Sequence, residues 1–186
     1  MDIYLIRHTT PKVEKGICYG ASDLEVVDSF SEEATAIRSI LPAYTENTRV
    51  VSSPLIRCKK LASFISSPKV VEIENQFKEM NFGDWEMHPW KSIDPIIMKK
   101  WFNNFVNIPC PNGESFQEVH DRTMKAFKAI QKSSSNQQLW IVAHSGIIRA
   151  ILSNLRSAPL KDAFKEKMDY GVVYKIDMNN KIIQLK

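Results

Sequence analysis

The chain has 186 residues, a length that suits one domain, and we expect a single domain over residues 1–186. Hydrophobic residues make up 44% and charged residues 25% of the sequence, which excludes an intrinsically disordered chain. The net charge of +4 is compatible with a small anionic ligand, and the scattered basic residues argue against a nucleic-acid-binding protein.

Nothing in the sequence indicates a membrane span or a secretory signal, because no apolar run is long enough and the N-terminal segment MDIYLIRH carries charges. The three cysteines, Cys18, Cys58 and Cys110, are odd in number and widely spaced, which indicates reduced thiols. We therefore expect a cytoplasmic protein with no membrane and no nucleic-acid partner. Both a monomer and a homodimer remain open.

Strands and helices are predicted to alternate along the chain. The apolar run at 3–6 predicts a buried strand, and the pattern at 31–44 predicts a helix with one apolar face. Further strands are expected at 50–51, 70–73 and 139–143.

Local signals mark the starts of the remaining helices. Ser53 followed by Pro54 predicts an N-cap and a first-turn proline. Ser115 and Glu118 have the spacing of a capping box, and a last helix is expected from Gly146 onward.

The chain ends in a predicted hairpin of strands 172–176 and 182–185. The alternation before it predicts an α/β fold, a three-layer α/β/α sandwich with a mainly parallel sheet. Residues 84–112 interrupt the alternation with three tryptophans and four of the nine prolines. We interpret this segment as an insert over the active site.

Polar side chains follow three of the predicted strands. Arg7-His8, Arg57 and His144 should meet at the edge of the sheet where the parallel strands end, which is where such sheets bind ligands. A guanidinium group can bind two phosphoryl oxygens at once through two parallel hydrogen bonds, and a neutral imidazole can attack phosphorus without a metal.

A phosphoryl-transfer site also needs a general acid for the leaving oxygen. Glu79, Asp84 and Glu86 lie in one segment and are the candidates.

Five motifs in this order resemble the histidine phosphatase (phosphoglycerate mutase-like) superfamily and span most of the chain: Leu5-Ile6-Arg7-His8-Thr9, Ser52-Ser53-Pro54-Leu55-Ile56-Arg57, Glu79-Met80-Asn81-Phe82-Gly83-Asp84-Trp85-Glu86, Gly113-Glu114-Ser115 and Val142-Ala143-His144-Ser145-Gly146. The resemblance implies the phosphoglycerate mutase-like fold and a cofactor-independent phosphomonoesterase without a metal site.

The resemblance also implies a role for each motif residue. His8 would be the nucleophile that becomes phosphohistidine, Glu79 the proton donor, and Arg7, Arg57 and His144 the groups that hold the phosphoryl oxygens.

The sequence departs from the family pattern at two positions, Thr9 and Met87, where glycine is common in the family. Neither residue would supply the chemistry, so the departures concern the shape of the pocket.

Within the superfamily, the segment Gly16-Ile17-Cys18-Tyr19-Gly20 and the Pro89-Trp90 pair resemble the α-ribazole phosphatase branch of cobalamin biosynthesis. This resemblance implies α-ribazole 5′-phosphate as substrate, with Cys18, Tyr19, Gly20 and Trp90 as substrate-binding residues. The alternatives are a phosphoglycerate mutase-like or broad-specificity sugar or metabolite phosphatase, and a non-catalytic module that binds a phosphorylated ligand.

Overall fold

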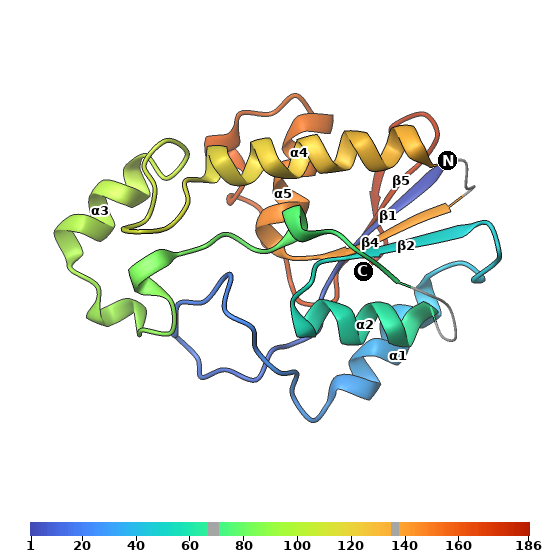
Figure 1. Cartoon of the computed structure of the whole chain (residues 1–186), viewed down its shortest axis with the longest axis horizontal. Helices are drawn as coiled ribbons and strands as arrows, with labels where there is room; N and C mark the ends of the chain where they lie inside the picture. Colours follow the sequence, from blue (N-terminus) through green and yellow to red (C-terminus); the bar gives the residue numbers. More distant parts are fainter. Residues whose placement is uncertain (67–70, 135–137) are drawn as a thin grey trace.

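The computed structural model describes residues 1–66, 71–134 and 138–186 (Figure 1). In these ranges one sheet contains the strands in the order β3-β2-β4-β1-β5-β6. The pairs β1–β4, β2–β4 and β2–β3 are parallel, and β5 pairs in antiparallel fashion with β1 and β6, which confirms a mainly parallel sheet with a C-terminal hairpin. The strands are β1 (Asp2–Arg7), β2 (Thr48–Ser52), β3 (Glu72–Ile73), β4 (Gln138–Ala143), β5 (Val173–Ile176) and β6 (Ile182–Gln184).

Helices cover both faces of the sheet, which confirms the three-layer sandwich (Figure 1). One face packs on α4 and α5, and the other packs on α1 and α2. The α-helices of the described residues are α1 (Phe30–Ile40), α2 (Ile56–Ser66), α3 (Pro95–Asn103), α4 (Phe116–Ser133) and α5 (Ser145–Leu155). Each of them is too short or too polar to serve as a membrane span.

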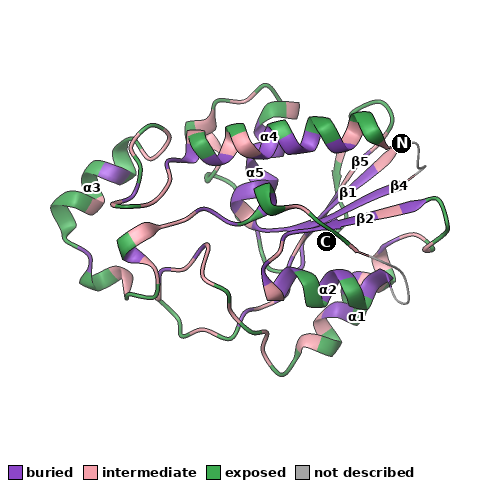
Figure 2. Ribbon diagram, in the orientation of Figure 1, coloured by how far each residue is buried: buried purple, intermediate pink, exposed green. Residues whose placement is uncertain are grey.

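The alternation of side chains along the buried strands builds a core on each face. In β1, Ile3 and Leu5 face the α4–α5 layer, whereas Tyr4 and Ile6 face the α1–α2 layer. Strands β1, β2, β4 and β5 are accordingly buried along most of their length (Figure 2). The last residue of β1, Arg7, is half-buried, because it leaves this core at the edge of the sheet.

Two helix boundaries differ from the prediction. Helix α1 ends at Ile40 rather than at residue 44, because Leu41 precedes Pro42 and adopts an extended conformation. Helix α2 begins at Ile56 rather than at Pro54, so Ser53 is not its N-cap. The Asp23 carboxylate, from a distant loop, accepts a 2.6 Å hydrogen bond from the Ile56 amide.

The other predicted elements lie close to their expected positions. The capping box at Ser115 is confirmed, since the Ser115 and Glu118 side chains bind each other's backbone amides. The strand expected at 70–73 is the short β3, whose two residues are both exposed, and Val70 lies outside the described residues. Helix α5 begins one residue earlier than expected, at Ser145.

Residues 84–112 contain α3, which lies at the end of the molecule remote from the N-terminus (Figure 1). The part before α3 pairs with the segment that follows β1. The Cys18 amide donates to the His88 carbonyl over 2.8 Å, and the Trp90 amide donates to the Gly16 carbonyl over 2.9 Å. These two segments therefore lie side by side next to the ends of the parallel strands.

Candidate active site

The ends of β1, β4 and β2 lie side by side because Arg7 pairs with Ala143 and Ser52 pairs with Val142. The residue that follows each strand continues the contact. The His8 amide donates to the Ala143 carbonyl over 3.1 Å, and the Ser53 amide donates to the Val142 carbonyl over 3.0 Å. His8, Ser53 and His144 therefore meet at one edge of the sheet, as the sequence predicted.

The His8 imidazole is held in one orientation and one tautomer. Its Nδ1 lies 2.6 Å from the Thr9 carbonyl oxygen, which can only accept, so Nδ1 carries the proton. The Nε2 atom then keeps its lone pair, and the Arg57 Nε–H group donates to it over 3.3 Å. Nε2 is the nitrogen that can act as a nucleophile.

Arg57 is fully buried beside His8. Its Nη2 donates to the Gly20 carbonyl over 2.6 Å and its Nη1 to the Ser22 carbonyl over 2.7 Å. These carbonyls fix the guanidinium plane at the end of the sheet.

Arg7 comes from the last position of β1 and is also fixed by a carbonyl, that of Met168, to which its Nη1 donates. The Tyr170 ring lies under the guanidinium carbon at 4.0 Å from the ring centre. The Arg7 Nε is buried without a hydrogen-bond partner in the structure. A buried, unpaired guanidinium donor is costly unless the site receives an acceptor.

His144 is buried next to His8, with 5.0 Å between the two ring centres. Its Nε2 shares a 2.7 Å hydrogen bond with the Ser53 hydroxyl, and the Cys58 Sγ lies 3.4 Å from the same nitrogen. His144 does not line the cavity described below. The structure thus places His144 beside His8, outside the set of residues that line the cavity.

Glu79 faces the same cavity from the segment between β3 and α3. Its Oε2 accepts from the Gly146 amide over 3.1 Å and from the Ser145 hydroxyl over 3.3 Å, and its Oε1 accepts from the Met80 amide over 3.0 Å. A side chain on residue 146 would come within 2.4 Å of the carboxylate, so the glycine permits this approach.

The other two candidate acids are engaged elsewhere. Asp84 is exposed and accepts from the Asn112 side chain. Glu86 accepts backbone hydrogen bonds of 3.0 Å from Gly20 and Ala21 and 3.2 Å from Ser22, so it anchors this loop. Neither side chain lines the cavity.

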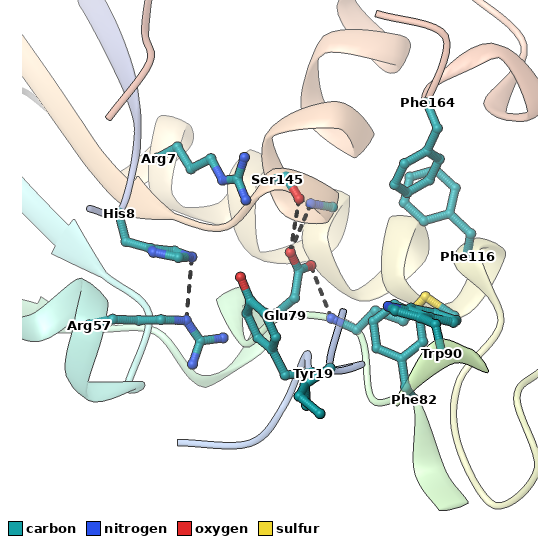
Figure 3. Close-up of a pocket in the computed structure, with 13 residues that line it drawn as sticks. Arg7, His8, Tyr19, Arg57, Glu79, Phe82, Trp90, Phe116, Ser145 and Phe164 are labelled. Atoms are coloured by element: carbon teal, nitrogen blue, oxygen red, sulfur yellow. Dashed lines mark hydrogen bonds between the residues drawn. The ribbon is translucent and has the colours of Figure 1, made fainter. Parts of the chain in front are cut away.

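The cavity has a volume of about 200 Å³ and combines a cationic end with an aromatic wall (Figure 3). Arg7 and Arg57 form the cationic end together with the neutral His8, and Glu79 lies opposite them. The remaining lining residues, most of them apolar, are Ile17, Tyr19, Met80, Phe82, Trp90, Phe116, Ser145, Gly146 and Phe164.

Two of the residues expected to bind substrate do not line this cavity. Cys18 is fully buried in the hydrophobic core, because the extended segment turns Tyr19 toward the cavity and its neighbour away from it. Gly20 is structural, since a side chain there would lie 1.9 Å from the Met80 carbonyl oxygen. Cys18 and Gly20 thus lie outside the set of residues that line the cavity, whereas Tyr19 and Trp90 belong to it.

Three aromatic residues near the site were missing from the sequence prediction. Phe116 and Phe164 line the cavity, and Tyr170 packs on Arg7 and lies 5.6 Å, ring centre to ring centre, from His8. Phe164 and Tyr170 lie in an irregular segment that has no periodic pattern to mark its place.

The two departures from the family motifs have different structural meanings. Met87 has a φ of 64°, a conformation that glycine adopts without cost, which gives a physical reason to expect glycine at this position. Thr9 is fully buried and offers His8 only its backbone carbonyl.

Both imidazoles are kept neutral by their surroundings. Burial lowers the pKa of His8 well below its ordinary value, and the charges of Arg57 and Arg7 lower it further, whereas the hydrogen bond that His8 donates to the Thr9 carbonyl raises it. The pKa of His144 is lowered in the same direction, mainly by burial and then by Arg57. Two uncharged imidazoles therefore lie beside two guanidinium groups, an arrangement suited to nucleophilic attack on an anionic phosphate ester.

Comparison with known proteins agrees with this geometry. The family model of the histidine phosphatase superfamily (branch 1) matches residues 3–186. A protein of Hydrogenobacter thermophilus that bears a phosphoserine phosphatase name is 30% identical over 95% of this chain and 89% of its own length. The adenosylcobalamin/alpha-ribazole phosphatase of Escherichia coli K12 is 25% identical over 100% of this chain and 94% of its own. The crystal structure of the alpha-ribazole phosphatase from Shigella flexneri is similar with a TM-score of 0.86 and 25% identity, over 96% of this chain and 91% of that one.

The lowered pKa values of His8 and His144 predict a loss of stability in mild acid. Below the unfolded-state pKa of about 6.5, the unfolded chain binds protons that the native state excludes, so the free energy of unfolding falls as the pH decreases. Each histidine should contribute a slope of up to about 1.4 kcal/mol per pH unit. Urea denaturation at several pH values between 7.5 and 5.5 should show that the free energy of unfolding depends less steeply on pH in His8→Asn than in the wild type. Parallel slopes would contradict a neutral, buried His8.

Proposed function

Since the chain belongs to the histidine phosphatase superfamily and is a phosphatase, we propose that it hydrolyses α-ribazole 5′-phosphate through a phosphohistidine formed on His8. In the first step the His8 Nε2 lone pair attacks phosphorus, the ester P–O bond breaks, and Glu79 protonates the leaving oxygen. In the second step water attacks phosphorus, Glu79 takes a proton from the water, and the P–N bond breaks to release phosphate and free His8.

The cationic end of the cavity supports this role for His8. Arg7 and Arg57 line it together with His8, and bidentate contacts from two guanidinium groups can hold a phosphoryl group in line with Nε2. Their charge stabilises the oxygens as negative charge builds up in the transition state. His144, whose ring centre lies 5.0 Å from that of His8, is proposed as a further contact for a phosphoryl oxygen.

Glu79 is proposed as the acid because it lines the cavity, whereas Asp84 and Glu86 do not. Its backbone contacts fix the carboxyl group at the N-terminus of α5 without removing it from the cavity. A positioned carboxyl group of this kind is what protonation of a poor leaving group requires.

The observation that carries the substrate proposal is the aromatic wall. Tyr19, Phe82, Trp90, Phe116 and Phe164 line the cavity beyond the cationic end. Among the described residues that line it, Arg7 and Arg57 are the cationic ones. A flat, uncharged benzimidazole base on a ribosyl monophosphate matches such a wall, and the names of the Escherichia coli and Shigella flexneri relatives agree with it.

Phosphoserine and phosphoglycerate are the competing substrates. Both carry a carboxylate besides the phosphate, and fructose 2,6-bisphosphate carries a second phosphate. Each would need a further cationic group beyond the two arginines that line the cavity. The phosphoserine phosphatase name of the Hydrogenobacter relative makes phosphoserine the most informative competitor.

The nucleophile is tested by His8→Ala. Turnover and any acid-labile phosphoenzyme should disappear while the far-UV circular dichroism spectrum stays unchanged, because His8 supplies the attacking nitrogen and little of the core. The assays are run in EDTA, in which we expect full wild-type activity. Near-normal turnover by the variant, or loss of wild-type turnover in EDTA, would refute the proposed mechanism.

The acid is tested by comparing Glu79→Gln with Glu86→Gln. Glu79→Gln should slow the hydrolysis of alkyl phosphates by about 10²–10⁴-fold and that of p-nitrophenyl phosphate far less, because nitrophenolate leaves without protonation. Glu86→Gln removes loop contacts instead, so it should slow both substrates by the same factor and lower the melting temperature. Equal losses for the two substrates in Glu79→Gln would remove Glu79 as the acid.

The substrate is tested by kcat/KM for α-ribazole phosphate, O-phosphoserine, 3-phosphoglycerate, fructose 2,6-bisphosphate and a nucleoside 5′-monophosphate. We expect α-ribazole phosphate to be best. Trp90→Ala should reduce its kcat/KM by about 5- to 100-fold through lost stacking, with a much smaller effect on O-phosphoserine. The matched control is Phe102→Ala, because Phe102 is an exposed ring near Trp90 that does not line the cavity. If O-phosphoserine or phosphoglycerate is clearly the best substrate, the α-ribazole proposal fails and the phosphatase activity stands.

A further inference from the structure

Tyr170 lies at the phosphoryl end of the site, yet it belongs to none of the sequence motifs. Its ring lies beneath the Arg7 guanidinium, with 4.0 Å between the guanidinium carbon and the ring centre. The same ring is 5.6 Å from the centre of the His8 imidazole. The Tyr170 side chain therefore contacts both Arg7 and His8.

The backbone around Tyr170 is tied to the same two residues. The Gly171 amide donates to the His8 carbonyl over 3.1 Å, and the Arg7 amide donates to the Val172 carbonyl over 3.0 Å. Since both flanking contacts involve the end of β1, the position of the Tyr170 ring is fixed relative to Arg7.

The hydroxyl of Tyr170 is also held. It shares a hydrogen bond with the hydroxyl of Tyr19, which lines the cavity and whose ring lies 5.7 Å from the Arg57 guanidinium carbon. The two tyrosines thus form a bridge between the segment that follows β1 and the segment that precedes β5. At one end of the bridge Tyr170 lies under Arg7, and at the other end Tyr19 lies near Arg57.

We propose that Tyr170 is a positioning residue that holds the Arg7 guanidinium in the orientation that receives the phosphoryl group, and that Tyr19 holds Tyr170 in place. Stacking on a ring restricts the guanidinium plane, and the Met168 carbonyl fixes its Nη1. The buried Arg7 Nε, which has no partner in the structure, is left for a ligand oxygen. Preorganising the cation in this way reduces the entropic cost of binding the anion.

The inference rests on the proposed phosphoryl-binding role of Arg7, so the experiment includes an Arg7 variant. The measured quantity is the competitive inhibition constant of orthovanadate, an anion that probes the phosphoryl site alone. Tyr170→Leu should raise this constant by about 5- to 30-fold, the range expected for loss of a desolvated cation–π contact. Tyr170→Phe keeps the ring and should stay within a few-fold of the wild type. Phe64→Leu removes an exposed ring of α2 that does not line the cavity, so it should leave the inhibition constant unchanged.

A double-mutant cycle separates positioning from a general structural effect. If Tyr170 acts through Arg7, then Tyr170→Leu added to Arg7→Gln should weaken vanadate binding no further. An additive loss would overturn the inference, as would an unchanged inhibition constant in Tyr170→Leu while Arg7→Gln weakens binding. An unchanged constant in Arg7→Gln would instead refute the phosphoryl-binding role of Arg7, and with it the proposed function. Should Tyr170→Leu fail to fold, Tyr170→Met gives the same comparison.

The bridge is tested by removing each hydroxyl. Tyr19→Phe and Tyr170→Phe should raise the vanadate constant by similar small factors, and the double variant should match either single variant, because each change breaks the same hydrogen bond. Independent, multiplying effects of the two substitutions would rule out a bridge that acts as one unit.

Discussion

Strand β4 pairs in parallel with β1 on one side and with β2 on the other, and the ends of the three strands lie in neighbouring registers. The segments that leave these strands therefore start at one edge of the sheet, where His8, Ser53 and His144 meet. A slip of one residue in either pairing would turn an imidazole to the opposite face. The relative placement of the two histidines is thus set by the buried apolar strands rather than by polar contacts within the site.

The loop at residues 20–22 lies between a buried cation and a carboxylate, and its peptide groups are oriented accordingly. Its carbonyls accept from Arg57, while its amides donate to Glu86. Hydrogen bonds to charged groups are stronger than neutral ones, which offsets the cost of burying the guanidinium. The same buried charge disfavours protonation of His8, so one loop stabilises both the cation and the neutral state of His8.

The sequence was sufficient to predict the sandwich and the strand-end residues, because both follow from local patterns. It was insufficient for positions that depend on tertiary contacts. Cys18 and Gly20 adjoin Tyr19 in the sequence, but the extended backbone and a close approach to Met80 exclude them from the cavity. Likewise, the cap of α2 comes from a distant carboxylate that no local pattern in the helix could indicate. Phe164 and Tyr170 lie in an irregular segment whose course is determined by arginines elsewhere in the chain.

Arg149 and Arg7 also explain how side chains in the wall of the cavity can change while the reacting groups stay in place. Arg149 of α5 donates to the carbonyls of Ala163 and Glu166 and lies 5.0 Å from the Phe164 ring centre. Arg7 of β1 holds the same segment further on, through Met168 and Tyr170. Because backbone carbonyls accept all three of these hydrogen bonds, they hold the path of the segment whatever side chains it carries. Substitution of Phe164, which lines the cavity, should therefore change which leaving group fits while Arg7, His8 and Arg57 stay in place. On this view the strand ends determine the reaction, and the irregular segments determine the substrate.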